Sequence, residues 1–485
     1  MSEQLVAGVD CSTQSTKVLV VDVSNGEVVA TGKADHTVDS GADGKSETHP
    51  DVWWNALREA LAQTGRASDI GAISIGGQQH GLVLEDATGT VLRPAVLWND
   101  TRSAAVMDRL LAGLGGADGW AQAIGSAPAT SFTVTSLAWL RQHEPDVVNQ
   151  AASICLPHDW LTKRLTGNAV TDRGDASGTG WWSPTKGDYI SDILALPDVD
   201  VDPSMLPTVL GPDQVAGDVT ADAAAQLGLP AGAKVGPGTG DNMAAALGLG
   251  VDHGTPVVSL GTSGTAYVTS SSPTVDPSGV VAGFASADGG FLPLVCTLNC
   301  TLAIDKIADW LQIDRNDAAA RTDAVVLPYL DGERTPALPL AAGTIIGLRH
   351  DTTKQQILRA AYEGAVASLL SGLETMAATG AEVTADAPIA LLGGGARGQR
   401  WRDVILEASG RPILLPDADE LVALGAAVQA AVALTGESAA QITAAWDTAK
   451  GTLIEPTTHD PTIVERVVNA TDALRPVLTR RTPGM

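Results

Sequence analysis

The sequence predicts an α/β protein with two duplicated domains, and three observations support this prediction. Residues 6–22 and 257–269 share a pattern in which a β-branched run enters a tight turn of Gly, Ser and Thr and leaves as a second β-branched run. Elsewhere, strand patterns alternate with amphipathic helices, which favours sheets covered by helices. A chain of 485 residues also exceeds what one core usually supports. We expect one domain over residues 1–248 and another over residues 249–485.

The elements follow in order around the two hairpins. A helix is predicted to open at Pro50, with Trp54 and Leu57 on one face. Residues 70–75 form the next strand. Residues 174–214 are rich in Pro, Asp and Gly, which predicts loops and a small subdomain. The other expected elements are a strand at residues 257–260 and helices near residues 103–114, 136–143, 159–165, 353–378, 418–434 and 461–474.

Composition narrows the class of protein. The chain has 30 Lys and Arg against 56 Asp and Glu, and this net charge of −26 argues against nucleic acid or an anionic membrane as a partner. No stretch approaches the ~20 apolar residues of a membrane helix, and the first residues lack the pattern of a signal peptide. Cys11, Cys155, Cys296 and Cys300 lack metal-type spacing, so we expect reduced thiols. These features predict a cytoplasmic protein and leave a homodimer open.

The two hairpin turns are candidates for binding phosphate. Small residues let a polyphosphate approach the main chain, where N–H groups and hydroxyls converge on it. Ser12 and Thr13 in the first turn, and Gly261 and Thr262 in the second, are therefore predicted to bind a nucleotide. Lys17, on the exit strand of the first hairpin, either joins them or is a solvated lysine. For either segment alone, an ordinary hairpin is the alternative.

A third glycine-rich segment lies in the second half of the chain. Residues 389–401 run from an aliphatic strand through three glycines into a helix, which presents a helix N-terminus and bare backbone to a ligand. Gly394, Gly395 and Ala396 are therefore predicted to bind the adenosine and α-phosphate end of a nucleotide, with a structural turn as the alternative. Trp310 is expected in the core, with a position beside the adenine as the alternative.

Asp241 lies in a glycine-rich junction between a strand and a helix, within residues 236–243. An Asp in this position often caps the helix. A cap does not require the Gly and Pro residues that precede Asp241, however. The small residues leave room for a substrate and a γ-phosphate to approach its carboxylate.

Eight segments follow one another along the chain, at residues 10–17, 76–81, 97–102, 171–179, 238–242, 259–264, 328–336 and 393–396. In this order they resemble the FGGY family of carbohydrate kinases over nearly the full length of the chain. The resemblance implies two actin-like (ribonuclease H-like) domains of the sugar kinase, heat-shock protein and hexokinase superfamily, with the active site in the cleft between them. Residues 79–81 and 98–100 favour the xylulokinase branch of the family. That branch implies ATP and Mg²⁺, with D-xylulose or a related ketose as the sugar.

Phosphoryl transfer needs a base and a metal ligand. A sugar hydroxyl is a poor nucleophile, so a base must receive its proton late in the transfer. Asp241 is the predicted base. Asp10, at the end of the first strand, is predicted to hold Mg²⁺ directly or through water, with a hydrogen bond inside the turn as the alternative.

A sugar site needs donors and acceptors for several hydroxyls, often beside an aromatic wall. Gln79, His80 and Asn242 are the predicted direct contacts. Trp98 and Asp100 are added from the matching segment. For His80 and Trp98, a place in the core is the alternative.

Two other functions stay open from sequence alone. An actin-like or chaperone-like ATPase would share the phosphate hairpins and the third glycine-rich segment. It would lack sugar residues such as His80 and the Asp241-Asn242 pair. A kinase for another ketose or polyol, such as ribulose or a methylpentulose, would share every motif, because stereochemistry cannot be read from motifs.

Overall fold

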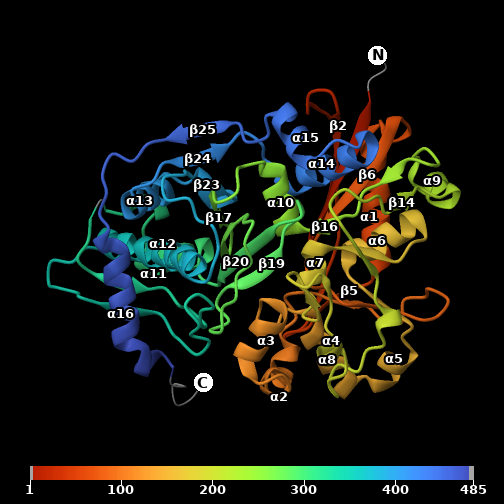
Figure 1. Ribbon diagram of the computed structural model, residues 1–485. Helices are drawn as coiled ribbons and strands as arrows, with labels where there is room; N and C mark the ends of the chain where they lie inside the picture. Colours follow the sequence, from red (N-terminus) through yellow and green to blue (C-terminus); the bar gives the residue numbers. More distant parts are fainter. Residues whose placement is uncertain (1–3, 320, 480–485) are drawn as a thin grey trace.

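The computed structural model describes residues 4–319 and 321–479, and it has two lobes that are each built on a mixed seven-stranded sheet (Figure 1). The first sheet contains β1 (Leu5–Cys11), β2 (Ser15–Asp22), β3 (Val28–Asp35), β6 (Ile70–Gly77), β14 (Gly217–Asp218), β15 (Lys234–Val235) and β16 (Thr239–Gly240). The second contains β17 (Pro256–Leu260), β18 (Gly264–Val268), β19 (Ala282–Ala285), β20 (Phe291–Thr297), β23 (Ile389–Leu392), β24 (Ile413–Pro416) and β25 (Gly451–Ile454). We name the lobes after these sheets, as the first lobe and the second lobe.

The two predicted hairpins occupy equivalent places in the two sheets. β1 pairs antiparallel with β2 and parallel with β6. In the same way, β17 pairs antiparallel with β18 and parallel with β23. A third antiparallel strand follows on the outer side of each hairpin, β3 in the first sheet and β20 in the second. This repeated pairing agrees with the duplication that the sequence predicted.

Most of the expected helices are present, with one correction. The region near residues 103–114 is not one helix, because a 3₁₀ turn spans Arg102–Val106 and α2 spans only Met107–Ala112. The Met107 N–H bonds back to Ala104, three residues earlier, and such a bond tightens the turn. The matching helices are α1 (Pro50–Thr64), α4 (Thr133–His143), α6 (Pro157–Thr166), α12 (Lys354–Ala378), α14 (Leu421–Thr435) and α16 (Thr462–Leu478).

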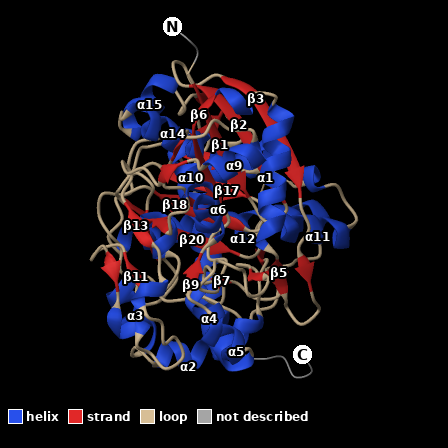
Figure 2. Cartoon of the chain, turned by 90° about the vertical axis from the view of Figure 1, so that its right-hand side faces the viewer, coloured by secondary structure: helices blue, strands red, loops and turns tan. Residues whose placement is uncertain are grey.

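The segment between the first sheet's strands β6 and β14 forms the accessory part of the first lobe. Residues 174–214 contain only short elements, such as α8 (Ser191–Leu194) and β11 (Trp182–Ser183), as the sequence predicted. The helices α2, α3 (Gly116–Ile124), α4 and α5 (Pro145–Gln150) gather at the end of the molecule away from the N-terminus (Figure 2).

The first sheet is covered on both faces. Val9 belongs to the same buried cluster as Trp53 of α1, whereas Val6 belongs to the cluster of Ala427 from α14. Because alternate side chains of a strand point to opposite faces, α1 and α14 cover opposite faces of this sheet. α14 thus returns to the first lobe from the far end of the chain, and the division at residues 248 and 249 stays a prediction.

α10 (Asp241–Leu249) crosses α14 at close range. A Cβ on Gly425 would lie 1.9 Å from the carbonyl oxygen of Ala244, and one on Gly248 would lie 2.2 Å from that of Leu421. Glycine is needed at both positions because no other residue permits this approach. The crossing holds α10, with Asp241 at its start, against the first sheet.

The second sheet is packed against the long helix α12. This helix is buried along most of its length, and it contacts β18 and β20 of the sheet together with α11 (Thr301–Leu311), α13 (Gln399–Ser409) and α16. All four cysteines are free thiols, as expected. Within the described residues, no single helix is long and apolar enough to cross a membrane. One bent pair, Leu421–Thr435 with Ala439–Trp446, passes on length and composition alone.

Candidate active site

Two cavities lie beside the first half of α10, and we name them after one residue each. The His80 cavity has a volume of about 180 Å³ and the Asp10 cavity one of about 750 Å³. Both are lined by the two lobes. The His80 cavity is lined by Gln79, His80, Trp98, Asp241 and Asn242 from the first lobe and by Ser263, Thr265 and Arg334 from the second. The Asp10 cavity is lined by Asp10, Lys17, Gly393, Gly394, Ala396 and Glu420, among others.

Asp241 is the first residue of α10, and Gly240 rather than Asp241 is the N-cap. Its Oδ1 accepts hydrogen bonds from the backbone N–H of Asn242 at 2.7 Å and from the Asn242 side chain at 2.9 Å. Burial raises the pKa of Asp241 to about 7; the negative charge of Asp175 adds to the rise and the bonds from Asn242 oppose it. A carboxylate with this pKa can accept a proton near neutral pH.

Gln79 and Asn242 are joined across the cavity wall. The Asn242 side-chain amide donates to Gln79 Oε1 at 2.9 Å. Gln79 is buried, and its Nε2 has no hydrogen-bond partner among the described residues. An amide donor without a partner, at the edge of a cavity, is suited to bind a ligand oxygen.

His80 stacks on Phe132, with ring centroids 4.9 Å apart, and it also lines the cavity. Burial lowers its pKa to about 4, and the positive charge of Arg334 lowers it further. The ring is therefore neutral at pH 7. Its Nδ1 lies 2.7 Å from the carbonyl oxygen of Gly178, so Nδ1 carries the proton and donates it. The other ring nitrogen, Nε2, is left as an acceptor.

Trp98 is not a core residue, because 42% of its surface is exposed and it lines the His80 cavity. Its Nε1 donates to the Thr13 hydroxyl at 3.0 Å, and that hydroxyl donates to Gln78 Oε1 at 3.3 Å. The turn of the first phosphate hairpin is thereby tied to the wall of the His80 cavity.

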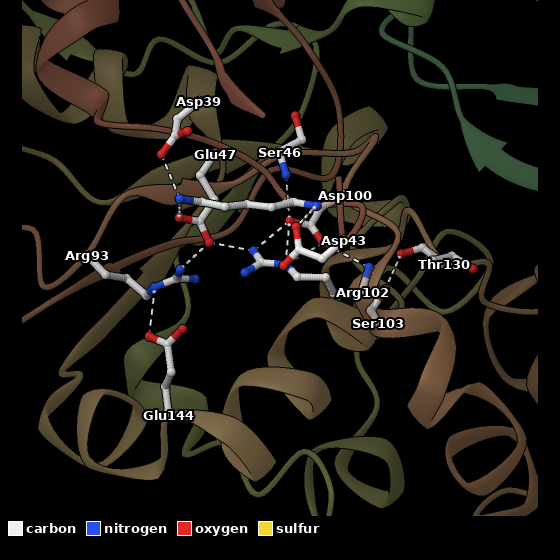
Figure 3. A network of polar contacts seen from close by, with 11 residues as sticks. Asp39, Asp43, Ser46, Glu47, Arg93, Asp100, Arg102, Ser103, Thr130 and Glu144 are labelled. Atoms are coloured by element: carbon white, nitrogen blue, oxygen red, sulfur yellow. Dashed lines mark hydrogen bonds and ion pairs between the residues drawn. The ribbon is translucent and has the colours of Figure 1, made fainter. Parts of the chain in front are cut away.

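The structure does not bring Asp100 to either cavity. Asp100 is buried in a polar network in which its carboxylate accepts from the Ser46 N–H at 2.9 Å and from Arg102 Nη2 at 2.6 Å (Figure 3). The same guanidinium also bonds to Glu47. Because these donors occupy its oxygens, Asp100 holds the segment after Trp98 in place, and it lines neither cavity.

Asp10 lies at the end of β1 in the wall of the Asp10 cavity. Burial raises its pKa to about 7; Lys17 opposes the rise, and Asp241 and Glu420 add to it. Oδ1 of Asp10 is buried without a partner among the described residues. Lys17 Nζ lies 2.6 Å from Oε2 of Glu420, so this partly exposed lysine is paired with a carboxylate.

The two predicted phosphate turns differ in how their polar groups are used. The Ser12 hydroxyl donates to the Ser15 carbonyl inside its own turn at 2.9 Å. The Gly261 carbonyl accepts from the Thr301 hydroxyl at 2.7 Å, which ties the second turn to α11. Thr262 is exposed at the tip of this turn.

The third glycine-rich segment contributes Gly394 and Ala396 to the wall of the Asp10 cavity. Gly395 does not line this cavity, because it packs against β17, where an added Cβ would lie 2.6 Å from Cβ of Leu260. Trp310 contradicts the expectation of a core position. It lies on the outer side of α11 with 59% of its surface exposed, and it lines neither cavity.

Arg334 and Glu420 are charged residues of these cavities that received no role from the sequence. Arg334 lies in the segment 328–336, which resembled the family but received no role. Glu420 lies just before α14, and its pairing with Lys17 spans 403 positions of the chain, for which no local pattern exists.

Comparison with known families matches two segments of the chain. Residues 5–248 match the N-terminal domain of the FGGY family of carbohydrate kinases, and residues 257–434 match its C-terminal domain. The chain belongs to this family. Two relatives named xylulose kinase, from Streptomyces coelicolor and Streptomyces rubiginosus, are each 52% identical over 479 residues, covering 98% and 99% of this chain and 98% of each relative.

Solved structures of FGGY kinases have the same fold. The xylulose kinase of Bifidobacterium adolescentis is 36% identical, with a TM-score of 0.85 over 97% of this chain and 100% of that chain. The glycerol kinase of Plasmodium falciparum, solved with ADP, is 18% identical with a TM-score of 0.82 over 99% of both chains, and it shares the fold alone. The predicted family, the two-domain α/β fold and the carbohydrate kinase activity are confirmed.

Proposed function

We propose that this FGGY kinase phosphorylates D-xylulose with ATP to give D-xylulose 5-phosphate and ADP. The observation that carries the proposal is Asp241, a carboxylate of raised pKa in a small cavity beside the polar groups of Gln79, His80 and Asn242. The names of the relatives at 52% identity support D-xylulose as the sugar. Because ATP is the phosphate donor, we also propose a cytoplasmic location.

Asp241 is the proposed general base. The sugar hydroxyl attacks the γ-phosphorus of ATP, and Asp241 receives the hydroxyl proton late in the transfer. The two hydrogen bonds from Asn242 hold one carboxylate oxygen, Oδ1, in a fixed direction. The other oxygen, Oδ2, can then face the sugar hydroxyl.

The sugar contacts follow from the free polar groups of the His80 cavity. Nε2 of His80 accepts a hydrogen bond from a hydroxyl, and the Gln79 amide donates one. Asn242 contributes through its bond with Gln79, and the exposed ring of Trp98 forms an aromatic wall. Asp100 acts only indirectly, through the segment that carries Trp98.

Asp10 fits the requirements of Mg²⁺. This ion uses one or two carboxylates together with substrate phosphates and water, rather than a cage of protein ligands. Among residues 4–319 and 321–479, no group of three or more His, Cys, Asp or Glu side chains could hold a metal ion. Asp10, with its unpartnered Oδ1, matches the sparser arrangement. Bound Mg²⁺ would supply charge neutralisation on the phosphate oxygens.

The nucleotide is proposed to lie in the Asp10 cavity. Gly394 and Ala396 give its adenosine end a wall without bulky side chains. Lys17, Ser12, Thr13, Gly261 and Thr262 are proposed to face the phosphates from the two hairpins. Gly395 keeps only an indirect role, because its backbone packs against β17.

A substrate panel tests the proposal. Purified protein with ATP and Mg²⁺ is offered a dozen ketoses and polyols, and ADP release is followed. We expect D-xylulose to give the highest kcat/KM, with ATP hydrolysis in the absence of sugar much slower, because water is poorly placed in an open cleft. Preference for ribulose or a methylpentulose would replace D-xylulose as the substrate. ATP hydrolysis at one rate with and without every sugar would overturn the kinase proposal.

A further inference from the structure

Arg334 brings a positive charge from the second lobe into the His80 cavity. It lies in the loop after β21 (Val325–Leu327) and lines the same cavity as Asp241, Asn242 and His80. Its charge reaches the His80 ring, where it contributes to the low pKa of that histidine. The roles proposed above for substrate and nucleotide do not use Arg334.

The backbone around Arg334 is fixed by buried hydrogen bonds. Glu333 is buried, and its carboxylate accepts from the N–H of Leu298 at 2.6 Å and from the N–H of Arg334 at 2.8 Å. The Thr335 hydroxyl donates to the Cys296 carbonyl at 2.8 Å. Arg334 is exposed, and its guanidinium has no hydrogen bond or ion pair with any described residue. A fixed backbone thus carries a side chain whose donors are free.

The cavity needs a cation when it holds a phosphoryl group. Among the described residues that line this cavity, Asp241 is the only charged side chain apart from Arg334, because His80 is neutral at pH 7. Lys17 lines the other cavity and is paired with Glu420. Among the residues that line this cavity, Arg334 is therefore the one that can offset the repulsion between Asp241 and a phosphoryl group, in addition to the charge neutralisation that bound Mg²⁺ would supply from Asp10. A guanidinium also matches phosphate oxygens with two parallel N–H bonds.

We propose that Arg334 binds the phosphoryl group during transfer and keeps this contact on the phosphate of the product. The inference rests on the proposed function. In the transfer, the bond from the γ-phosphorus to the bridging oxygen of ATP breaks and the bond from phosphorus to the sugar oxygen forms. The hydroxyl proton passes to Asp241 and ADP leaves. Arg334 keeps all its protons and contributes only charge and hydrogen bonds.

The lobe from which each lining residue comes supports a phosphate contact for Arg334 over a sugar contact. Ser263 and Thr265, from the second phosphate hairpin, line the His80 cavity from the same lobe as Arg334. The proposed sugar contacts, Gln79 and His80, come from the first lobe. Arg334 therefore belongs to the same lobe as the groups that are proposed to face phosphate. The proposed sugar contacts belong to the other lobe.

The test compares Arg334→Ala and Arg334→Lys with wild-type protein. We expect Arg334→Ala to lower kcat by ~10²-fold to 10³-fold, the usual effect of removing one donor to a developing charge. Arg334→Lys should recover part of the loss, because it keeps the charge without the two-pronged geometry. Arg349→Ala is the matched control, since it removes an exposed arginine of the second lobe that lines neither cavity.

Binding without turnover separates phosphate recognition from a merely structural role. Titration calorimetry would give the Kd of D-xylulose and of D-xylulose 5-phosphate for each variant. We expect Arg334→Ala to weaken the sugar phosphate by ~10-fold or more, as a charge-assisted bond of ~1.5 to 3 kcal/mol predicts, and to leave D-xylulose nearly unchanged. Equal weakening of both ligands would assign Arg334 to the sugar. Unchanged binding and turnover in folded Arg334→Ala would also overturn the proposal.

The experiment distinguishes this inference from the proposed function. Wild-type turnover of D-xylulose tests the function alone. The difference between sugar and sugar phosphate in Arg334→Ala tests the inference alone. If the substrate panel selects another ketose, the same comparison is made with that ketose and its phosphate.

Discussion

The two cavities each contain one carboxylate with a pKa of about 7, yet the surroundings of the two carboxylates differ. Asp10 has Lys17 nearby, and one of its oxygens is buried without a partner. Asp241 has no cation among the influences that set its pKa, and Asn242 bonds to it twice. The two carboxylates thus reach the same pKa, Asp10 against the opposing effect of Lys17 and Asp241 without such a contribution from a cation. This difference suits Asp10 to binding a metal ion and Asp241 to accepting a proton.

Asp241→Asn should have the largest effect. The change keeps the shape and the hydrogen bonds that Oδ1 accepts, but it removes the ability to take a proton. We expect kcat to fall by ~10² to 10⁴ while ATP still binds. Kinetics and ATP titration on a variant shown to be folded by thermal melting would measure this. Near-normal turnover would refute the assignment of Asp241 as the base.

Asp10→Asn should differ from Asp241→Asn in its response to magnesium. We expect turnover at low Mg²⁺ to fall by ~10²-fold, since a lost metal ligand removes a few kcal/mol of charge stabilisation. Raising Mg²⁺ should restore part of the loss, because the base is intact. A magnesium series for both variants sharpens the comparison. Equal recovery of the two, or of neither, would remove the distinction drawn between the carboxylates.

His80→Ala tests the sugar side of the comparison. The loss of one buried polar contact costs ~1 to 3 kcal/mol, so the KM for the ketose should rise by ~5-fold to 150-fold. The KM for ATP should change far less, because His80 does not line the Asp10 cavity. His143→Ala is a suitable control, since it removes an exposed histidine of the first lobe that lines neither cavity. Unchanged sugar kinetics would assign His80 to packing against Phe132.

Two of the predicted site residues that line the cavities, Asp10 and Asp241, lie at or near the ends of single elements. Asp10 is the last residue but one of β1 and Asp241 is the first residue of α10, so a strand pattern followed by a turn was enough to locate both. Asp100 was predicted as a sugar contact from the matching segment, and local sequence does not show that Ser46 and Arg102 occupy its oxygens. Contacts made by tertiary packing leave no local signal.

The same limit applies to the fold. The helix near residues 418–434 was predicted from its apolar pattern, but no pattern tells which sheet α14 covers. The structure places α14 on the first sheet through the helix crossing at Gly248 and Gly425, which are 177 positions apart in the chain. Trp310 was wrongly assigned to the core from residue type alone, whereas its position on the outer side of α11 depends on how that helix is turned.

The pH profile should show the base directly. Asp241 acts only when deprotonated, and its pKa is about 7 in the free protein. kcat/KM should therefore fall as the pH drops below about 7, by ~10-fold per unit. At saturating Mg²⁺ this limb belongs to Asp241, because metal binding keeps Asp10 deprotonated. At low Mg²⁺ both groups contribute and the limb should steepen. A limb that begins near pH 4 would contradict the raised pKa of Asp241.

Glu420→Gln should have the smallest effect and should act on Asp10 alone. Glu420 raises the pKa of Asp10, whereas Lys17 lowers it. Removing the Glu420 carboxylate should lower the pKa of Asp10. At low Mg²⁺, the acid limb of the kcat/KM profile should therefore move to lower pH. At saturating Mg²⁺ the limb should stay in place, because the pKa of Asp241 is set by burial, Asn242 and Asp175.

Glu420→Gln also tests what Lys17 does once it has lost its carboxylate partner. The pair is partly exposed, with 28% of the Lys17 side chain and 40% of the Glu420 side chain accessible, so it is worth at most ~1 kcal/mol. If Lys17 faces phosphate, its release in Glu420→Gln should lower the Kd for ATP by up to ~5-fold. Lys17→Ala should raise that Kd, and adding Glu420→Gln to it should then change ATP binding little, because no lysine remains to be released.

A weaker ATP affinity in Glu420→Gln would mean that Glu420 positions Lys17 for phosphate instead of keeping it away from phosphate. A shift of the acid limb at saturating Mg²⁺ would mean that the two carboxylates titrate as one coupled pair, which would end the distinction between them.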